Sequence, residues 1–114
     1  MDTKQFFKQF GEDYKKVVEY SMNFGYDVNE AQFNKLNEIV KFLQREDFEI
    51  ENLDINPALI HGGVTAYTYV MHFFDKSLKE FIDILENASA VSFDADKKGR
   101  VCISITVADV FKRL

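Results

Sequence analysis

The chain has 114 residues, 46% of them hydrophobic and 29% charged, with five glycines and one proline. This composition excludes a disordered, collagen-like or low-complexity chain and predicts a single domain over residues 1–114. Fourteen basic side chains against nineteen acidic ones give a net charge of -5, which disfavours direct binding to nucleic acid or to an anionic membrane.

Cysteine usage and the first residues bear on the cellular compartment. Cys102 is the only cysteine, so we expect neither an intramolecular disulfide nor a thiolate metal cluster, and a reducing compartment is the simpler interpretation. The opening segment lacks the apolar run of a signal peptide, and no ten apolar residues follow one another anywhere in the chain. These features predict a soluble cytoplasmic protein.

Apolar residues at helical spacing predict a first helix from Asp2 or Thr3 to about Asn23, ended by a left-handed Gly25. A second helix has the clearest start signal in the sequence. Asn29 is the predicted cap, and Gln32 is placed to reach back to it in a capping box. Val28 is placed to contact Phe33, the first residue of a predicted buried face that comprises Phe33, Leu36, Ile39, Val40 and Leu43.

From Asp47 the period changes to two, because Phe48 and Ile50 alternate with Asp47, Glu49 and Glu51. This alternation predicts a half-buried strand whose carboxylates point outward from one face.

Pro57 and the pair Gly62 and Gly63 are expected to bracket a loop or short turn, which a long strand from Val64 to Phe74 follows. This strand is rich in β-branched and aromatic residues, which favours a central position covered on both sides. Its two faces differ in size, with Thr65, Tyr67, Tyr69, Met71 and Phe73 on one and Val64, Ala66, Thr68, Val70 and His72 on the other.

Ser77 and Glu80 form the capping box of a third predicted helix that ends near Asn87. Its predicted sheet-facing side comprises Leu78, Phe81, Ile82 and Leu85. A hairpin follows over Ala90 to Thr106, because Asp96 to Gly99 fits a turn with a left-handed glycine. The expected pairs are Ala95 with Val101, Phe93 with Ile103, Val91 with Ile105, Asp96 with Arg100, Asp94 with Cys102 and Ser92 with Ser104.

A short last helix is predicted from Ala108 to Arg113, with Val110 and Phe111 against the sheet. The expected fold class is therefore α+β. Two N-terminal helices precede a ββαββ unit and the short C-terminal helix, and a mainly antiparallel sheet of about four strands packs on the helices.

The chain's whole excess of five negative charges falls within residues 46–54, since the segments on either side each carry seven acidic and seven basic residues. Asp47, Glu49 and Glu51 therefore form a local acidic row. The row fits two interpretations, an edge strand protected by charge against aggregation or a docking surface for a basic partner.

Catalytic patterns are weak. His61, Gly62 and Gly63 resemble an oxyanion loop, but no nucleophile elbow accompanies them, and Cys102 has no histidine beside it in the predicted hairpin. His72 and Asp75 are the other candidates for a site near His61. Since no metal-binding, Walker, Rossmann or zinc-finger pattern occurs, we expect neither a metal nor a cofactor.

The large side chains on one face of the long strand form an aromatic contact surface if that face is bare, and a second core layer if a helix covers it. They are Tyr67, Tyr69, Met71 and Phe73. We therefore expect a non-catalytic protein-binding module, an inhibitor or immunity-type protein or an adaptor acting on a basic protein partner through Asp47, Glu49, Glu51, Tyr67 and Tyr69. The alternatives are a small-ligand-binding or enzymatic domain near His61, His72 and Asp75, and a chaperone-like homodimer.

Overall fold

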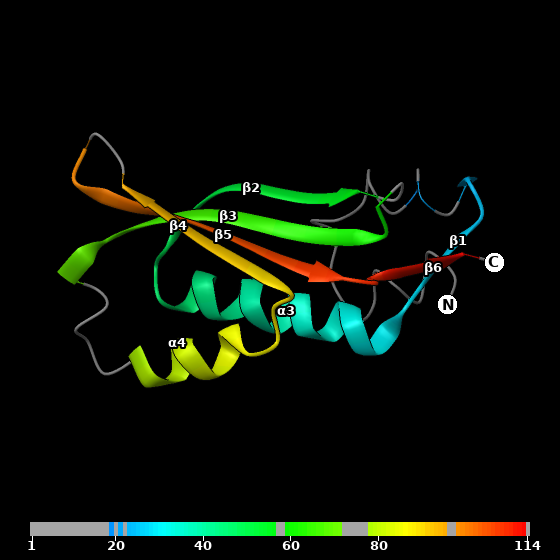
Figure 1. Cartoon of the computed structure of the whole chain (residues 1–114), viewed down its shortest axis with the longest axis horizontal. Coiled ribbons are helices and arrows are strands. Elements are labelled where there is room, and N and C mark those ends of the chain that lie inside the picture. Colours follow the sequence, from blue (N-terminus) through cyan, green and yellow to red (C-terminus); the bar gives the residue numbers. More distant parts are fainter. Residues whose placement is uncertain are drawn as a thin grey trace.

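The computed structural model describes Glu19, Ser21 and residues 23–56, 59–71, 78–95 and 98–113. The elements in chain order are β1 (Tyr26–Val28), α3 (Glu30–Arg45), β2 (Glu49–Asn56), β3 (His61–Tyr69), α4 (Leu78–Leu85), β4 (Ala90–Ala95), β5 (Arg100–Ala108) and β6 (Phe111–Arg113). Figure 1 shows α3 and α4 together on one side of the main sheet. The predicted α+β class is thus confirmed, although the predicted order of elements is not matched throughout.

The main sheet has four strands in the order β2-β3-β5-β4, and all neighbours are antiparallel. β3 is a central strand, as predicted. The expected C-terminal helix is wrong, because residues 111–113 form β6 and pair with β1 in a separate two-stranded ribbon. Asp109 has a φ of 56° and turns the chain into that strand. Val110 and Phe111 are nevertheless buried, as the sequence indicated.

The predicted first helix lies largely outside the described residues, of which only Glu19, Ser21 and Asn23 belong to it and are helical. Gly25 has the expected left-handed conformation, with a φ of 83°.

Helix α3 begins after Asn29, as predicted, but without a capping box. The Asn29 side chain makes no cap hydrogen bond, and its carbonyl accepts the Phe33 N–H at 2.9 Å. Gln32 instead donates its side-chain amide to the carbonyl of Ala108 at 3.0 Å, because the end of β5 offers an acceptor beside the helix start. The predicted apolar face is buried throughout.

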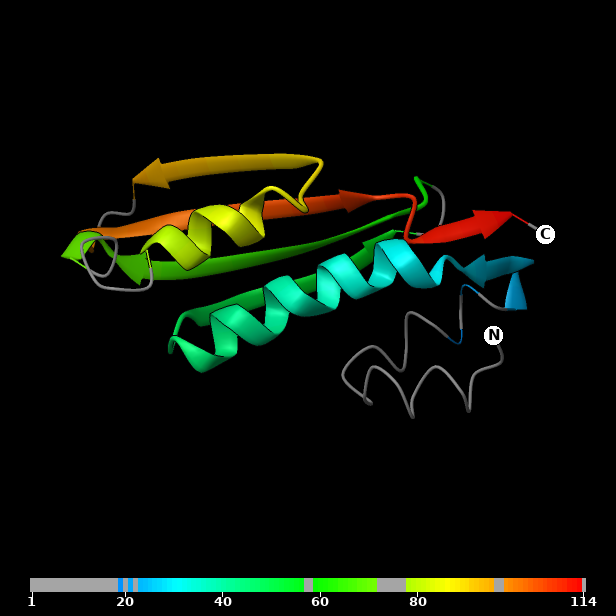
Figure 2. The same cartoon turned by 90° about the horizontal axis from the view of Figure 1, so that it is seen from below.

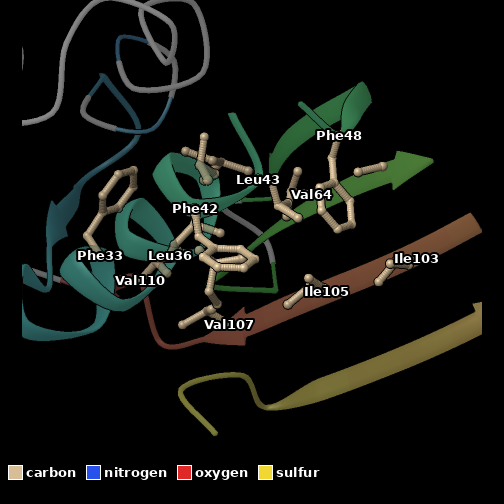
Figure 3. Close-up of a cluster of buried hydrophobic side chains, with 14 of the residues drawn as sticks. Phe33, Leu36, Phe42, Leu43, Phe48, Val64, Ile103, Ile105, Val107 and Val110 are labelled. Carbon is tan, nitrogen blue, oxygen red and sulfur yellow. The ribbon is translucent and has the colours of Figure 1, made fainter. Parts of the chain in front are cut away.

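The core fills the space between α3, α4 and one face of the sheet. Figure 3 shows its side chains on α3 and on the strands. Phe81 of α4 stacks on Phe42 and on Phe48, with ring centroids 5.4 and 5.6 Å apart. Phe33 meets Phe111 edge to face at 6.1 Å, which joins the start of α3 to the ribbon. On α4 the predicted inward residue Ile82 is 53% exposed, and Ile84 packs against the core in its place.

A turn at Leu59 and Ile60 lies inside the loop predicted between Pro57 and the glycine pair, but the glycines themselves belong to the strand that follows. Gly62 and Gly63 lie inside β3, and Ile60, with a φ of 56°, belongs to the turn that precedes the strand. A Cβ on Gly62 would lie 2.7 Å from Cδ2 of Leu36, so the glycine allows α3 to approach the sheet closely. Gly62 therefore provides space for helix packing, in addition to lying next to the predicted turn.

The β4–β5 hairpin has the predicted register at each described pair, from Ala95 with Val101 to Ala90 with Thr106. Gly99 has a φ of 77°, as a left-handed turn residue should. Asp96 and Ser77, whose pairing and capping roles were predicted, lie outside the described residues.

Candidate functional site

The main sheet has one helix-covered face and one face on which no described helix packs, here called the open face (Figure 1). Side chains of β3 alternate accordingly, since Val64, Ala66 and Thr68 are buried while Thr65 and Tyr67 are half-buried. The expectation that this strand is covered on both sides is therefore wrong for the described part of the chain. Tyr67 and Tyr69 belong to the open face.

Arg100 connects an acidic and an aromatic side chain at one end of the open face. Its Nη1 donates to Oε2 of Glu49 at 2.5 Å, and its Cζ lies 4.5 Å from the centroid of the Tyr67 ring. Arg100 comes from β5 and Glu49 from β2, so the guanidinium crosses the intervening strand β3. The Arg100 side chain is only 17% exposed, whereas that of Glu49 is 69% exposed. The pair therefore presents a carboxylate outward over a shielded cation.

The Tyr67 hydroxyl joins the two hairpins. Hydrogen bonds to Cys102 and to Glu51 raise the pKa of Tyr67 to about 12, because both partners favour the neutral phenol. Cys102 is the register partner of Tyr67 on β5 and is half-buried. Its other strand neighbour is Asp94, as predicted, so neither residue paired with Cys102 is a histidine.

Asp47 lies in a helix-ending turn and not on the strand as predicted. It has a φ of 59°, and its N–H donates to the carbonyl of Gln44 at 3.3 Å. The next N–H, of Phe48, returns to the carbonyl of Leu43 at 3.0 Å, which completes a Schellman motif with Asp in the position that glycine usually takes. Strand β2 consequently begins at Glu49.

A bulge between Ile50 and Asn52 then interrupts the pairing of β2 with β3. The predicted regular row of three carboxylates is thus broken on both sides of Glu49. Asp47, Glu49 and Glu51 are nonetheless all exposed.

Four of the five predicted binding residues line one hollow of about 420 Å³, here called the acidic hollow. The fifth, Glu51, contacts the hollow through its hydrogen bond to Tyr67. Met71, which the sequence placed on the same strand face as the two tyrosines, also lines it. Arg100 lines it too, and sequence reasoning missed Arg100 as a site residue. The wall comprises Asp47, Glu49, Tyr67, Thr68, Tyr69, Met71 and Arg100.

The rim of the acidic hollow is accessible, because Tyr69 is 62% exposed and Met71 is 81% exposed. Carboxylates beside aromatic faces suit a cationic group, which gains both charge pairing and cation–π attraction. The arrangement is therefore equipped for binding a positively charged side chain.

The alternative site is only partly described. His61 begins β3 and borders a smaller hollow of about 170 Å³ with Asp54, Gly63 and Thr106, far along the strand from Tyr69. His72 and Asp75 lie outside the described residues. Within the part of the chain that the structure describes, no three His, Cys, Asp or Glu side chains gather as a metal site requires. Nor does any described helix have the length and apolarity to cross a membrane.

Comparison with known proteins found no matching family model, no similar curated protein and no similar solved structure.

Proposed function

We propose that this chain is a non-catalytic protein-binding module that takes a basic protein partner on the open face of its sheet and acts on that partner as an inhibitor or adaptor. The observation that carries the proposal is the acidic hollow, where exposed carboxylates and two tyrosines share one accessible wall. Partly polar surfaces that contain tyrosine and methionine are typical of protein interfaces.

The charges of the acidic hollow favour a cation. The charged residues of the wall are Asp47, Glu49 and Arg100, so their formal charges sum to -1. Because Arg100 is shielded beneath Glu49, an approaching partner meets the carboxylates first. The surrounding segment 46–54 holds five acidic and no basic residues, and its field would steer a basic partner towards the hollow. A lysine or arginine of the partner would then lie against Tyr69 with its charge facing Asp47.

The test is a comparison of two variants with equal net charge. One replaces Asp47, Glu49 and Glu51 with Asn or Gln. The matched control makes the same replacements at Glu38, Asp83 and Glu86, exposed carboxylates on and just after the two helices. A basic partner captured from a host extract supplies the ligand, and stopped-flow mixing at low salt measures its association rate.

We expect the hollow variant to associate at least about tenfold more slowly than the control, because steering depends on where the charge lies. Arg100→Gln should act in the opposite direction, since it leaves Glu49 uncompensated and makes the hollow more negative. Equal rates for the two triple variants would contradict the proposal and leave the carboxylates of β2 as edge protection alone.

A further inference from the structure

The two border strands of the main sheet, β4 and β2, differ in how they are protected against pairing with a further strand. Within the described residues β4 pairs only with β5, and Figure 2 shows its outer side free of any described element. Edge strands present backbone N–H and C=O groups that can pair with another strand, and charge, proline or bulges usually prevent this. β2 has such protection in Glu49, Glu51, Asp54 and its bulge. β4 has Asp94 as its single charge and neither lysine nor proline.

Apolar surface accompanies this border. Phe93 is 52% exposed, and it lies on the helix side of the sheet because it pairs with the buried Ile103. Ile82 of α4, the helix on that same side of the sheet, is 53% exposed. An exposed aromatic side chain beside an unprotected edge is a surface that gains free energy when a further strand covers it.

We infer that two copies of this chain pair antiparallel through β4, with Ser92 facing Ser92 of the second copy. The two four-stranded sheets then become one continuous eight-stranded sheet. In this register Val91 faces Phe93 of the second copy on the helix side. Ala90 faces Asp94 of the second copy on the open face. Helices of both copies stay on one side, because paired residues share a face.

The distance between the Asp94 carboxylates of the two copies distinguishes this register from the one centred on Phe93. With Ser92 at the centre, the two Asp94 carboxylates are four residues apart along the strands, or about 13 Å, which exceeds the Debye length of about 8 Å in physiological salt. A register centred on Phe93 halves that distance to about 7 Å and places Asp94 beside Ser92 of the second copy.

The chain's acidic segment does not oppose this pairing. Residues 46–54 lie at the β2 border, so the two acidic borders end up on opposite sides of the joined sheet, about 34 Å apart across seven strand spacings. Each copy has a net charge of -5, but the repulsion between the two acidic segments acts over a long distance and is screened by salt. Because the strand is complementary to itself in this register, a second copy is the occupant that the sequence of β4 favours.

The test uses opposite charges at the centre of the pairing. Sedimentation of the full chain from about 1 µM to about 1 mM should show a mass rising from 13.3 kDa towards twice that value. Ser92→Lys and Ser92→Glu should each raise the dimer dissociation constant at least about tenfold, because like charges then face each other directly. An equimolar mixture of the two variants should restore the dimer. Ser92 is exposed, so neither change should disturb the fold, which circular dichroism checks.

Asn52→Lys and Asn52→Glu are the matched controls, since Asn52 is an exposed residue of the other border strand. They should leave the dissociation constant unchanged. A monomer mass over the whole concentration range would overturn the inference, and so would a mixture that dimerises no better than its separate components. Neither result would affect the proposed binding of a basic partner, because Ser92 does not line the acidic hollow.

Discussion

The two hairpins of the main sheet use glycine for opposite reasons. Gly99, in the β4–β5 turn, has a φ of 77°, and an added Cβ would have nothing within 4 Å. Gly62, in the β2–β3 hairpin, has no such backbone requirement, yet an added Cβ would lie 2.7 Å from Leu36. The first glycine provides a backbone conformation and the second provides space. A glycine in a sequence therefore indicates either a turn or a close approach, and the two kinds respond differently to substitution.

The largest expected effect is at the packed glycine. Gly62→Val should lower the free energy of unfolding by about 3 kcal/mol, because the new side chain would displace Leu36, which is fully buried in the core. Urea unfolding followed by circular dichroism measures the loss. Gly62→Asn should be similarly harmful, since a different backbone preference does not relieve the contact. A loss below about 1 kcal/mol for Gly62→Val would mean that α3 shifts freely on the sheet.

A smaller loss is expected at the turn glycine. Gly99→Val should cost about 1 to 2 kcal/mol, because a β-branched residue resists positive φ. Here Gly99→Asn should recover most of the stability, since asparagine tolerates the left-handed region. The same unfolding assay serves. If asparagine were as harmful as valine at both positions, the distinction between the two glycines would fail.

The contact between the hairpins should give a pH effect. Since the pKa of Tyr67 is raised from 10.0 to about 12 in the folded chain, its contribution to stability is complete below pH 10. That contribution is lost as the pH rises from 10 to 12, because the unfolded phenol ionises first. The free energy of unfolding of the Tyr67→Phe variant should therefore fall less steeply with rising pH across this window than that of the unsubstituted chain. Identical slopes would show that the hydroxyl does not join the hairpins.

The smallest expected effect on stability is at the acidic hollow. Replacing Asp47, Glu49 and Glu51 together by Asn or Gln should change the free energy of unfolding by less than about 1 kcal/mol, because exposed ion pairs contribute little. Asn also tolerates the left-handed conformation that Asp47 adopts. Chemical denaturation of the triple variant checks this. A larger loss would assign the carboxylates a mainly structural role.

The sequence predicted those features of the fold that are determined within one short segment of the chain. The β4–β5 register follows from a turn signal and strict alternation within one short segment, and each described pair agrees. The buried face of α3 follows in the same way from helical spacing. Elements that depend on distant contacts were not predicted. The strand Phe111–Arg113 exists because it pairs with Tyr26–Val28, and three residues carry no period of their own.

The candidate site shows the same division. Charge and aromatic character predict a binding role for four residues, and the pairing of β2 with β3 brings them together. They are Asp47, Glu49, Tyr67 and Tyr69. Arg100 was missed because its reach across β3 to Glu49 depends on β5 lying beside β3. No segment of the sequence encodes that neighbour relation locally. The Schellman turn at Asp47 was not predicted, because the sequence has aspartate at the position where glycine usually indicates such a turn.

Val110 has a consequence for folding during synthesis. Its N–H donates to Ile60 at 3.1 Å, its carbonyl accepts the Asn29 N–H at 3.0 Å, and its side chain is fully buried. The start of α3 and the turn before β3 are thus both completed by a residue that is synthesised well after either segment. A ribosome builds the chain from the N-terminus, so Phe33 stays without its Phe111 contact until then. A nascent chain that stalls before residue 110 would present an open core to chaperones and to other nascent chains.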